Sequence, residues 1–515
     1  MNIRFLQILD NFAESLTERL EKRKLWLLCG FSILYLVVTS SIASRKLMWN
    51  DELFTYYIAV LPHISDIWSA LLSGGELTPP LVHLLTRAAV TLFGGSHIAI
   101  RLPEILGFWV MSLCLFQFVS KRSSALYGCV VMLFPLVTQA YYYATEARPY
   151  ALVLGFSGLS LLCWQAAAEE HARTRSLVGL AISLAAAVSS HYYAVLLFVP
   201  LAIGEGVRSR SLRRLDLPIW LALGSAMTPL LLYLPLIERS GTYSATFWAQ
   251  PSWEAIPSFY SKLLAPAILP LVAVFMLSAL YSMPDPITPR RQMQGFRSPL
   301  PLYEMAAAFG FTAIPVVAVL LAKLVTGAFT YRYALPAVIG FSILLAVAAS
   351  NFRGGRALIG AALVLSLCGW FVVQGVTSYR DMATLLDQAN TYKFLQSQRE
   401  HELPIVVSDL HTFMLLAYYA PRELAARLVY LADPGLSLHY LGHSSVDQGI
   451  LELKPWFPVN IERYGPYVAS QRRFFVYGYP GGLNWLFNEL TAAEMRIELR
   501  GRNANKLLLL VSPNE

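Results

Sequence analysis

Long apolar segments separated by short basic clusters run through the first 376 residues of this 515-residue chain. The first segment, Leu25 to Ala43, is long enough to cross a bilayer, because a membrane-spanning helix needs about twenty residues. The chain is 56% hydrophobic and only 14% charged, with a mean hydropathy of +0.51. A soluble domain of this size would need far more charge to cover its surface. We therefore predict a polytopic membrane protein.

The basic clusters set the expected orientation of the chain in the membrane. Residues 1–24 have the periodicity of an amphipathic helix and end in Lys22, Arg23 and Lys24. Such a helix suits the cytoplasmic surface, where basic groups meet anionic lipid. Further arginine clusters fall between apolar segments, including the loop 283–299, as the positive-inside rule requires. The net charge of +8 follows from this pattern and does not indicate a nucleic-acid partner.

Residues 25–376 are expected to form about eleven spans, which places residues after 376 outside the cytoplasm. The first outer loop, residues 45–100, contains two amphipathic helices that end at Gly74-Gly75 and Gly94-Gly95. Residues 377–515 read as a small extracytoplasmic α/β domain. Its predicted strands are LPIVVSD, RLVYL, RRFFVYG and KLLLLVS, and its predicted helices are Thr412 to Tyr419 and Leu483 to Ala493. The five cysteines lie in or beside apolar runs and predict neither disulfides nor a zinc site.

Acidic residues at the expected outer face are the first candidates for chemistry. Asp51 and Glu52 follow the first span, and Glu146 lies at the turn between two later spans. Adjacent residues in a helix point about 100 degrees apart, so Asp51 and Glu52 cannot form a dyad with each other. Two structural alternatives remain open. Asn50 or Asp51 caps a helix that begins near Leu53, and Glu146 pairs locally with Arg148.

Three arginines, two histidines and two tyrosines complete the candidate site. Arg101, Arg148 and Arg332 lie at outer ends of spans, where they either snorkel or bind an anion such as phosphate. The remaining candidates are His83, His191, Tyr331 and Tyr333. Each histidine is either an ordinary satisfied polar group or a functional residue, and the tyrosines fit an aromatic belt or sugar stacking. No metal motif is present; carboxylates at this face are compatible with a divalent cation, but nothing indicates one.

Several short segments resemble one family of membrane enzymes. They are WNDE after the first span, TPPLVHLL, IRLPEILG, YYYATEARPYAL, SSHYYAVLL and TYRYALPAVIGFSILLA, in this order over roughly residues 25 to 350. Together they resemble the polytopic GT-C glycosyltransferases, in particular bacterial relatives of protein O-mannosyltransferases and lipid A aminoarabinose transferases. The resemblance implies a polyprenyl-phosphate sugar donor, used at the periplasmic side of the bacterial inner membrane. The acceptor is a lipid, a glycan or a protein.

The resemblance also implies roles for single residues. Asp51 corresponds to the catalytic acid of the family, and Glu146 to the acidic position of the second outer turn. Two departures stand out: Thr78 replaces a histidine found in many relatives, and the first loop lacks an obvious lysine for the donor phosphate. Arg101, Arg148 or Arg332 would then serve.

These observations predict an inverting glycosyl transfer that needs no cofactor. Asp51 is the expected general base, with Glu52 and Glu146 as the other candidate catalytic acids. Arg148 and Arg332, with Arg101 behind them, are expected to stabilise the departing phosphate. The alternative is a transporter or flippase of lipid-linked sugars. Transporters usually show repeated halves and charges at the midplane of the bilayer, and neither is visible here. A non-catalytic envelope assembly protein would leave the grouping of acids and arginines unexplained.

Overall fold

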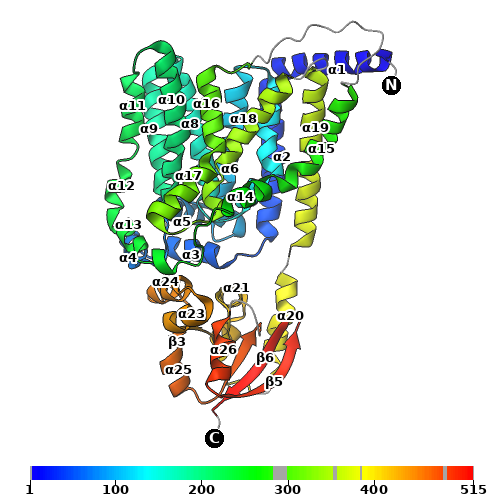
Figure 1. Ribbon diagram of the computed structural model, residues 1–515. Helices are drawn as coiled ribbons and strands as arrows, with labels where there is room; N and C mark the ends of the chain where they lie inside the picture. Colours follow the sequence, from blue (N-terminus) through cyan, green and yellow to red (C-terminus); the bar gives the residue numbers. More distant parts are fainter. Residues whose placement is uncertain are drawn as a thin grey trace.

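The computed structural model describes residues 3–281, 298–351, 356–382, 385–398, 400–479 and 484–513. A bundle of apolar helices forms one part of the molecule, and a smaller α/β domain lies against one end of it (Figure 1). Helix α1 (Ile3–Lys22) crosses the opposite end of the bundle. The predicted fold class, a polytopic helical membrane protein with a C-terminal α/β domain, is confirmed. Most of the predicted loop 283–299 lies outside the described residues.

Five helical segments of the described chain are long and apolar enough to cross a membrane. Three bent pairs of helices pass the same test when each pair is taken as one span, with bends of 74°, 66° and 49°. The shorter or less apolar helices α9 (Arg173–Ser190), α10 (Phe198–Leu212) and α18 (Ala337–Ser350) correspond to the remaining predicted spans. The single segments are α2 (Lys24–Arg45), α6 (His97–Ser120), α8 (Tyr150–Ala168), α14–α15 (Ala255–Leu264 and Ile268–Tyr281) and α19 (Arg356–Asp381). The bent pairs are α7–η1 with η2 (Ala125–Val137 and Gln139–Thr145), α11–α12 with α13 (Leu217–Leu232 and Leu234–Gly241), and α16 with α17–η6 (Leu302–Thr312 and Ile314–Thr326).

Helices α6 and α8 approach each other closely because glycines lie at their contact. A Cβ atom added to Gly155 would come within 2.5 Å of the backbone oxygen of Gly107. Small residues that let two backbones approach are typical of helix contacts in membranes. The contact places the N-terminal part of α6, which carries Arg101, beside the turn that precedes α8.

The first outer loop folds into three short helices, α3 (Asn50–Ala59), α4 (Ile64–Ser73) and α5 (Leu81–Phe93). The last two match the predicted helices and end at Gly74 and Gly94, both with positive φ. Helix α3 begins at Asn50, and the carboxylate of Glu52 accepts a hydrogen bond from the Trp49 N–H at 3.4 Å. Neither Asn50 nor Asp51 is therefore the N-cap, so that structural alternative for Asp51 is wrong.

The α/β domain contains a six-stranded sheet with the order β3-β2-β1-β4-β6-β5. The first four strands in this order are parallel, and β6 and β5 are antiparallel to their neighbours. The strands are β1 (Ile405–Val407), β2 (Leu428–Ala432), β3 (Ile461–Arg463), β4 (Phe474–Gly478), β5 (Arg496–Asn503) and β6 (Lys506–Ser512). The four predicted strands are present. The sequence pattern missed β3, which is short, and β5, whose charged residues lie on an exposed edge.

Helices cover both faces of this sheet. They are α20 (Leu385–Gln396), α21 (Leu410–Tyr419), α22 (Arg422–Ala425), α23 (Pro434–Leu441), α24 (Ser445–Leu453), α25 (Tyr464–Ser470) and α26 (Trp485–Ala492). The predicted helix 412–419 is α21. The predicted helix 483–493 is α26, and residue 483 lies outside the described residues.

The α/β domain packs on the first outer loop. Helices α21 and α24 lie on the side of the domain that faces the bundle (Figure 1). Leu53 and Ile58 of α3 share one buried core with Phe413 of α21. The ring of Phe457 lies 5.2 Å from the rings of both Phe54 and Tyr57. The site therefore forms where three parts meet: the membrane helices, the outer loop and the α/β domain.

Candidate active site

A cavity of about 690 Å³ opens between the membrane helices and the α/β domain. Its lining combines aromatic rings with charged groups from distant parts of the chain. These include Lys46 and Trp49 of the outer loop, Tyr142, Tyr143 and Glu146 at the second outer turn, Trp248 and Lys262 of the segment around α14, Tyr331 and Arg332 of η7 (Tyr331–Ala334), and His411 and Leu415 of α21. A cavity of this size and lining suits a polar headgroup with apolar parts.

Asp51 pairs with Arg332 at the edge of this cavity. The Arg332 Nη1 lies 3.2 Å from Asp51 Oδ2, and the Arg332 Nε donates to Thr330 Oγ1, also at 3.2 Å. The guanidinium lies 5.4 Å from the centre of the Tyr150 ring. Arg332 lines the cavity, whereas Asp51 is not among its lining residues. The structure thus brings together two predicted residues that are 281 positions apart.

Arg148 is buried and balanced by an acid that the sequence analysis did not select. Its Nη1 lies 2.8 Å from Glu76 Oε2 and also donates to the backbone oxygen of Asp51 at 3.2 Å. Burial alone would raise the pKa of Glu76, but the charge and hydrogen bonds of Arg148 bring that pKa to about 2. Arg148 therefore stabilises the first turn of α3 through the backbone oxygen of Asp51. Glu76 carries no motif, and its role depends on this long-range contact.

His83 lies in the same buried layer. Its Nε2 is 3.1 Å from Thr78 Oγ1, and burial lowers the pKa of His83 to about 4. The ring is therefore neutral at pH 7. Thr78, the departure from the family pattern, here serves as a hydrogen-bond partner of that ring.

Arg101 and Glu52 form a fully buried pair. The Nε and Nη2 of Arg101 donate to the two carboxylate oxygens of Glu52, at 2.7 and 2.8 Å. Arg101 also donates to the backbone oxygens of Ala43, Lys46 and Leu47. Glu52 accepts in addition from the Ala147 N–H at 2.8 Å. The pair thereby joins α2, α3, α6 and the second outer turn, and both side chains are 0% exposed.

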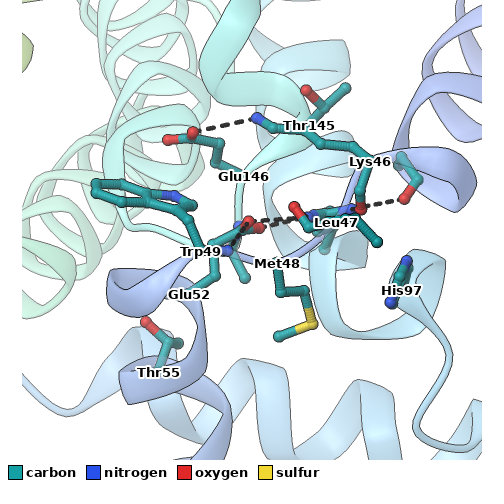
Figure 2. Close-up of polar contacts among 12 residues, drawn as sticks. Lys46, Leu47, Met48, Trp49, Glu52, Thr55, His97, Thr145 and Glu146 are labelled. Atoms are coloured by element: carbon teal, nitrogen blue, oxygen red, sulfur yellow. Dashed lines mark hydrogen bonds and ion pairs between the residues drawn. The ribbon is translucent and has the colours of Figure 1, made fainter. Parts of the chain in front are cut away.

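Glu146 pairs with Lys46, a residue that the sequence analysis did not identify. The Lys46 Nζ donates to Glu146 Oε1 at 3.1 Å (Figure 2). The second oxygen, Oε2, is buried, and the Tyr142 hydroxyl interacts with this carboxylate. Burial raises the pKa of Glu146 and lowers that of Lys46, since both charged forms lose solvation. The predicted local alternative, a pair between Glu146 and Arg148, is not what forms.

Lys46 and Lys262 supply cationic groups to the cavity wall. The Lys262 Nζ lies 5.7 Å from the centre of the Tyr331 ring and forms no ion pair with any described residue. Lys46 directly follows Arg45 at the end of the first span, and no recognisable sequence motif surrounds it. The positive-inside rule does not require a lysine at the face predicted to be extracytoplasmic, and this unexpected position is the sequence signal that could have identified both lysines. With Arg332, these side chains make the cavity suitable for an anion.

The remaining candidates, Tyr331, Tyr333 and His191, line two neighbouring hollows that share Arg332. Tyr331 faces the main cavity and accepts a hydrogen bond from the Tyr143 hydroxyl at 2.8 Å. His191 and Tyr333 lie in a small hollow behind Arg332, with ring centres 4.8 Å apart. Burial lowers the pKa of His191 to about 3, so this ring is also neutral.

Comparisons with known proteins agree with this architecture. Residues 78–237 match the family model for dolichyl-phosphate-mannose-protein mannosyltransferases. Two solved structures of ArnT from Cupriavidus metallidurans have similar folds, one in the apo state and one bound to undecaprenyl phosphate. Each superposes with a TM-score of 0.55 at 13% identity, covering 94% and 95% of this chain and 98% of ArnT. No curated protein matches the sequence significantly. The predicted resemblance to GT-C glycosyltransferases is confirmed, and the chain has the fold of an integral membrane protein of that type.

Proposed function

We propose that this protein is a membrane glycosyltransferase that moves a sugar from a polyprenyl-phosphate donor to an acceptor hydroxyl. The observation that carries the proposal is the Asp51–Arg332 pair, at 3.2 Å, beside a cavity lined by Lys46 and Lys262. A carboxylate next to several cations matches a reaction that takes a proton and releases a phosphate. The ArnT structure that holds undecaprenyl phosphate supports the same class of donor. The active site and the α/β domain would face the periplasm, with α1 on the cytoplasmic surface of the inner membrane.

The proposed reaction is a single displacement with inversion. The acceptor hydroxyl oxygen forms a bond to the anomeric carbon, and the bond from that carbon to the phosphate oxygen breaks. The electron pair of the broken bond remains on the phosphate oxygen, and the hydroxyl proton passes to the Asp51 carboxylate. Asp51 must first be released from Arg332, and binding of the anionic donor to that guanidinium would release it. The products are the glycosylated acceptor and polyprenyl phosphate.

The donor phosphate would lie among Arg332, Lys46 and Lys262. Arg332 is suited to phosphate because its planar group donates parallel hydrogen bonds. Lys46 would exchange Glu146 for the phosphate, leaving Glu146 free to orient the acceptor. The lysine that the sequence analysis did not find in the first loop is thus Lys46. Tyr331 and Trp49 would contact the sugar.

The other candidates have positioning roles in this proposal. Arg101 and Glu52 use their hydrogen-bonding groups on each other and on the backbone, so we assign them to the support of α3. Arg148 positions Asp51 by donating a hydrogen bond to the backbone oxygen of Asp51. The neutral rings of His83 and His191 fill buried layers around the site. These roles replace the phosphate-binding and catalytic roles that the sequence suggested for Arg101, Arg148 and Glu52.

Replacement of Asp51 by Asn tests the proposal. We expect purified Asp51→Asn in lipid nanodiscs to release polyprenyl phosphate about a thousandfold more slowly, as loss of a general base predicts. The measurement is mass spectrometry of free polyprenyl phosphate after addition of donor lipids and candidate acceptors. Asp66→Asn is the matched control, because Asp66 lies on the same loop and caps α4 through the His63 N–H.

Two outcomes would count against the proposal. Near-normal turnover of Asp51→Asn would remove this residue from the base role. Movement of donor lipid across the bilayer by the wild type, without release of polyprenyl phosphate, would favour the transporter alternative.

A further inference from the structure

The α/β domain contributes His411 to the wall of the main cavity. Asp409 caps α21 by accepting from the Thr412 N–H at 2.8 Å, and this cap places His411 in the first turn of the helix. The ring centre of His411 lies 6.2 Å from that of Trp49, which lines the same cavity from the residue before α3 (Figure 2). Neither the imidazole ring nor the indole N–H has a role in the proposed proton transfer or in the binding of phosphate.

Asn50 determines which nitrogen of His411 carries the proton. The Asn50 Nδ2 donates to Asp51 Oδ1 at 3.1 Å, because a carboxylate can only accept hydrogen bonds. The amide oxygen of Asn50 therefore faces His411, whose Nδ1 lies 3.2 Å away. Since this oxygen can only accept, Nδ1 carries the proton. Loss of solvation at the cavity wall lowers the pKa of His411, so the ring is neutral at pH 7 and its Nε2 is a hydrogen-bond acceptor.

The cavity wall thus combines an unused acceptor with an unused donor. The Nε2 of His411 has no hydrogen-bond partner among the described residues. The indole N–H of Trp49 is buried and is likewise without a partner in the described part of the chain. Polar groups left unpaired are costly, so a ligand group that satisfies both gains that energy. A sugar hydroxyl accepts and donates through one oxygen atom, whereas a carboxylate only accepts and an ammonium group only donates.

Trp49 also connects this pair of groups with the proposed phosphate site. The Arg332 guanidinium lies 5.9 Å from the centre of the Trp49 ring. A sugar whose phosphate is bound by Arg332 would therefore lie against this ring, and the apolar face of a sugar suits an aromatic surface. These distances favour the donor sugar, rather than the acceptor, as the ligand that meets Trp49 and His411.

We propose that Trp49 and His411 recognise one hydroxyl group of the donor sugar. The hydroxyl oxygen accepts from the Trp49 N–H, and the hydroxyl proton is donated to His411 Nε2. This inference rests on the proposed function, and it narrows the donor to sugars that carry a free hydroxyl at the position facing α21. The α/β domain would then determine donor specificity as well as form part of the cavity wall.

Binding of donor analogues to the full-length protein in nanodiscs tests this recognition without requiring transfer. The probes are farnesyl phosphate and its esters with glucose, galactose, mannose, N-acetylglucosamine and arabinose, titrated calorimetrically with empty nanodiscs as the blank. We expect at least one sugar probe to bind the wild type more tightly than farnesyl phosphate. Among the monodeoxy forms of that probe, the one that lacks the recognised hydroxyl should bind about tenfold more weakly.

Two substitutions separate recognition of the hydroxyl from folding. His411→Asn places an amide N–H where Nδ1 lies, so the bond to Asn50 is kept while the acceptor at Nε2 is lost. Trp49→Phe keeps an aromatic ring and loses the N–H. Each should weaken binding of the sugar probe about tenfold, without changing that of farnesyl phosphate or of the sensitive monodeoxy form. His411→Gln, whose longer amide reaches the position of Nε2, should restore part of the loss. The matched control is His439→Asn, because His439 is exposed on α23 and does not line the cavity.

The outcomes separate this proposal from the proposed function. Asp51→Asn should keep the preference for the hydroxyl while losing transfer. If the wild type transfers no sugar but binding shows the preference, the proposed function fails and the recognition of the hydroxyl is upheld. The recognition is overturned if no sugar probe binds more tightly than farnesyl phosphate, or if every monodeoxy form binds as well as its parent. It is also overturned if His411→Asn weakens binding of farnesyl phosphate as much as that of the sugar probe.

Discussion

Loss of a buried ion pair should lower the free energy of unfolding of this protein more than loss of an exposed one. Arg101 and Glu52 are completely withdrawn from solvent, and each satisfies hydrogen-bonding groups that would otherwise be stranded. Lys454 and Glu462 form a pair at 2.9 Å with side chains 42% and 48% exposed. Water solvates the second pair in any case. The free energy of unfolding should therefore depend on the first pair and hardly on the second.

Replacement of Glu52 by Gln should destabilise the protein by about 3–5 kcal/mol, because it leaves the Arg101 charge buried without a partner. Glu462→Gln should cost less than about 1 kcal/mol. Thermal unfolding in nanodiscs measures both. Equal melting temperatures for the two variants would contradict the structural role that we give to Glu52.

Arg332→Lys should impair transfer at least about tenfold and raise the KM for the donor, because lysine cannot replace a planar group that donates in two directions. Steady-state kinetics with varied donor concentration measures the effect. Arg239→Lys is the control, since Arg239 forms a partly exposed pair with Glu452 away from the cavity. Unchanged donor KM in Arg332→Lys would mean that Arg332 does not contact the phosphate.

At the scale of helices and strands, the local sequence pattern was sufficient to predict those elements in which apolar residues or turn-forming glycines dominate. The apolar spans, the glycine ends of α4 and α5 and the four hydrophobic strands were predictable because composition and turn chemistry decide them. The bends in three spans were not, since they depend on packing against neighbours. The edge strand β5 was missed for the same reason: its charged sequence forms a strand only because β6 pairs with it.

Gly155→Ala tests the close contact between α6 and α8. The added methyl group would meet the Gly107 backbone at 2.5 Å, so the helices must separate, at a cost of about 1–3 kcal/mol. The turn that carries Glu146 and Arg148 should shift with α8, so both melting temperature and transfer should fall. Gly206→Ala in α10 is the control, because no described atom outside the neighbouring backbone of α10 lies within 4 Å of the added group. That change should be neutral or stabilise by up to about 1 kcal/mol.

At the scale of the whole molecule, the site depends on contacts between residues far apart in the chain. Arg148 meets Glu76 across 72 positions, and His411 meets Asn50 across 361. Sequence reasoning could select Asp51, Glu146 and Arg332 as candidates, because charged residues are unexpected at the ends of spans on the face predicted to be extracytoplasmic. It could not find Glu76 or His411, because nothing near them in the sequence shows what they will contact.

Phe457→Ala should loosen the docking of the α/β domain, since this ring packs against Phe54 and Tyr57 of α3. Loss of a buried phenyl group costs about 3–5 kcal/mol in a packed core. Hydrogen exchange should accelerate in residues 50–59 while the strands keep their protection, and transfer should decline. Leu499→Ala on exposed β5 is the control. Unaltered exchange in residues 50–59 would show that the ring does not hold the two parts together.

The position of β6 has a consequence for how the protein is made. Residues 506–512 form an inner strand of the sheet, between β4 and β5, and that sheet carries the helix from which His411 and Leu415 close the cavity. Because β6 follows every membrane span in the sequence, the cavity is incomplete until the end of the α/β domain has been synthesised. Chains interrupted before residue 506 would lack β6, and on the proposed function we expect them to reach the bilayer without transfer activity.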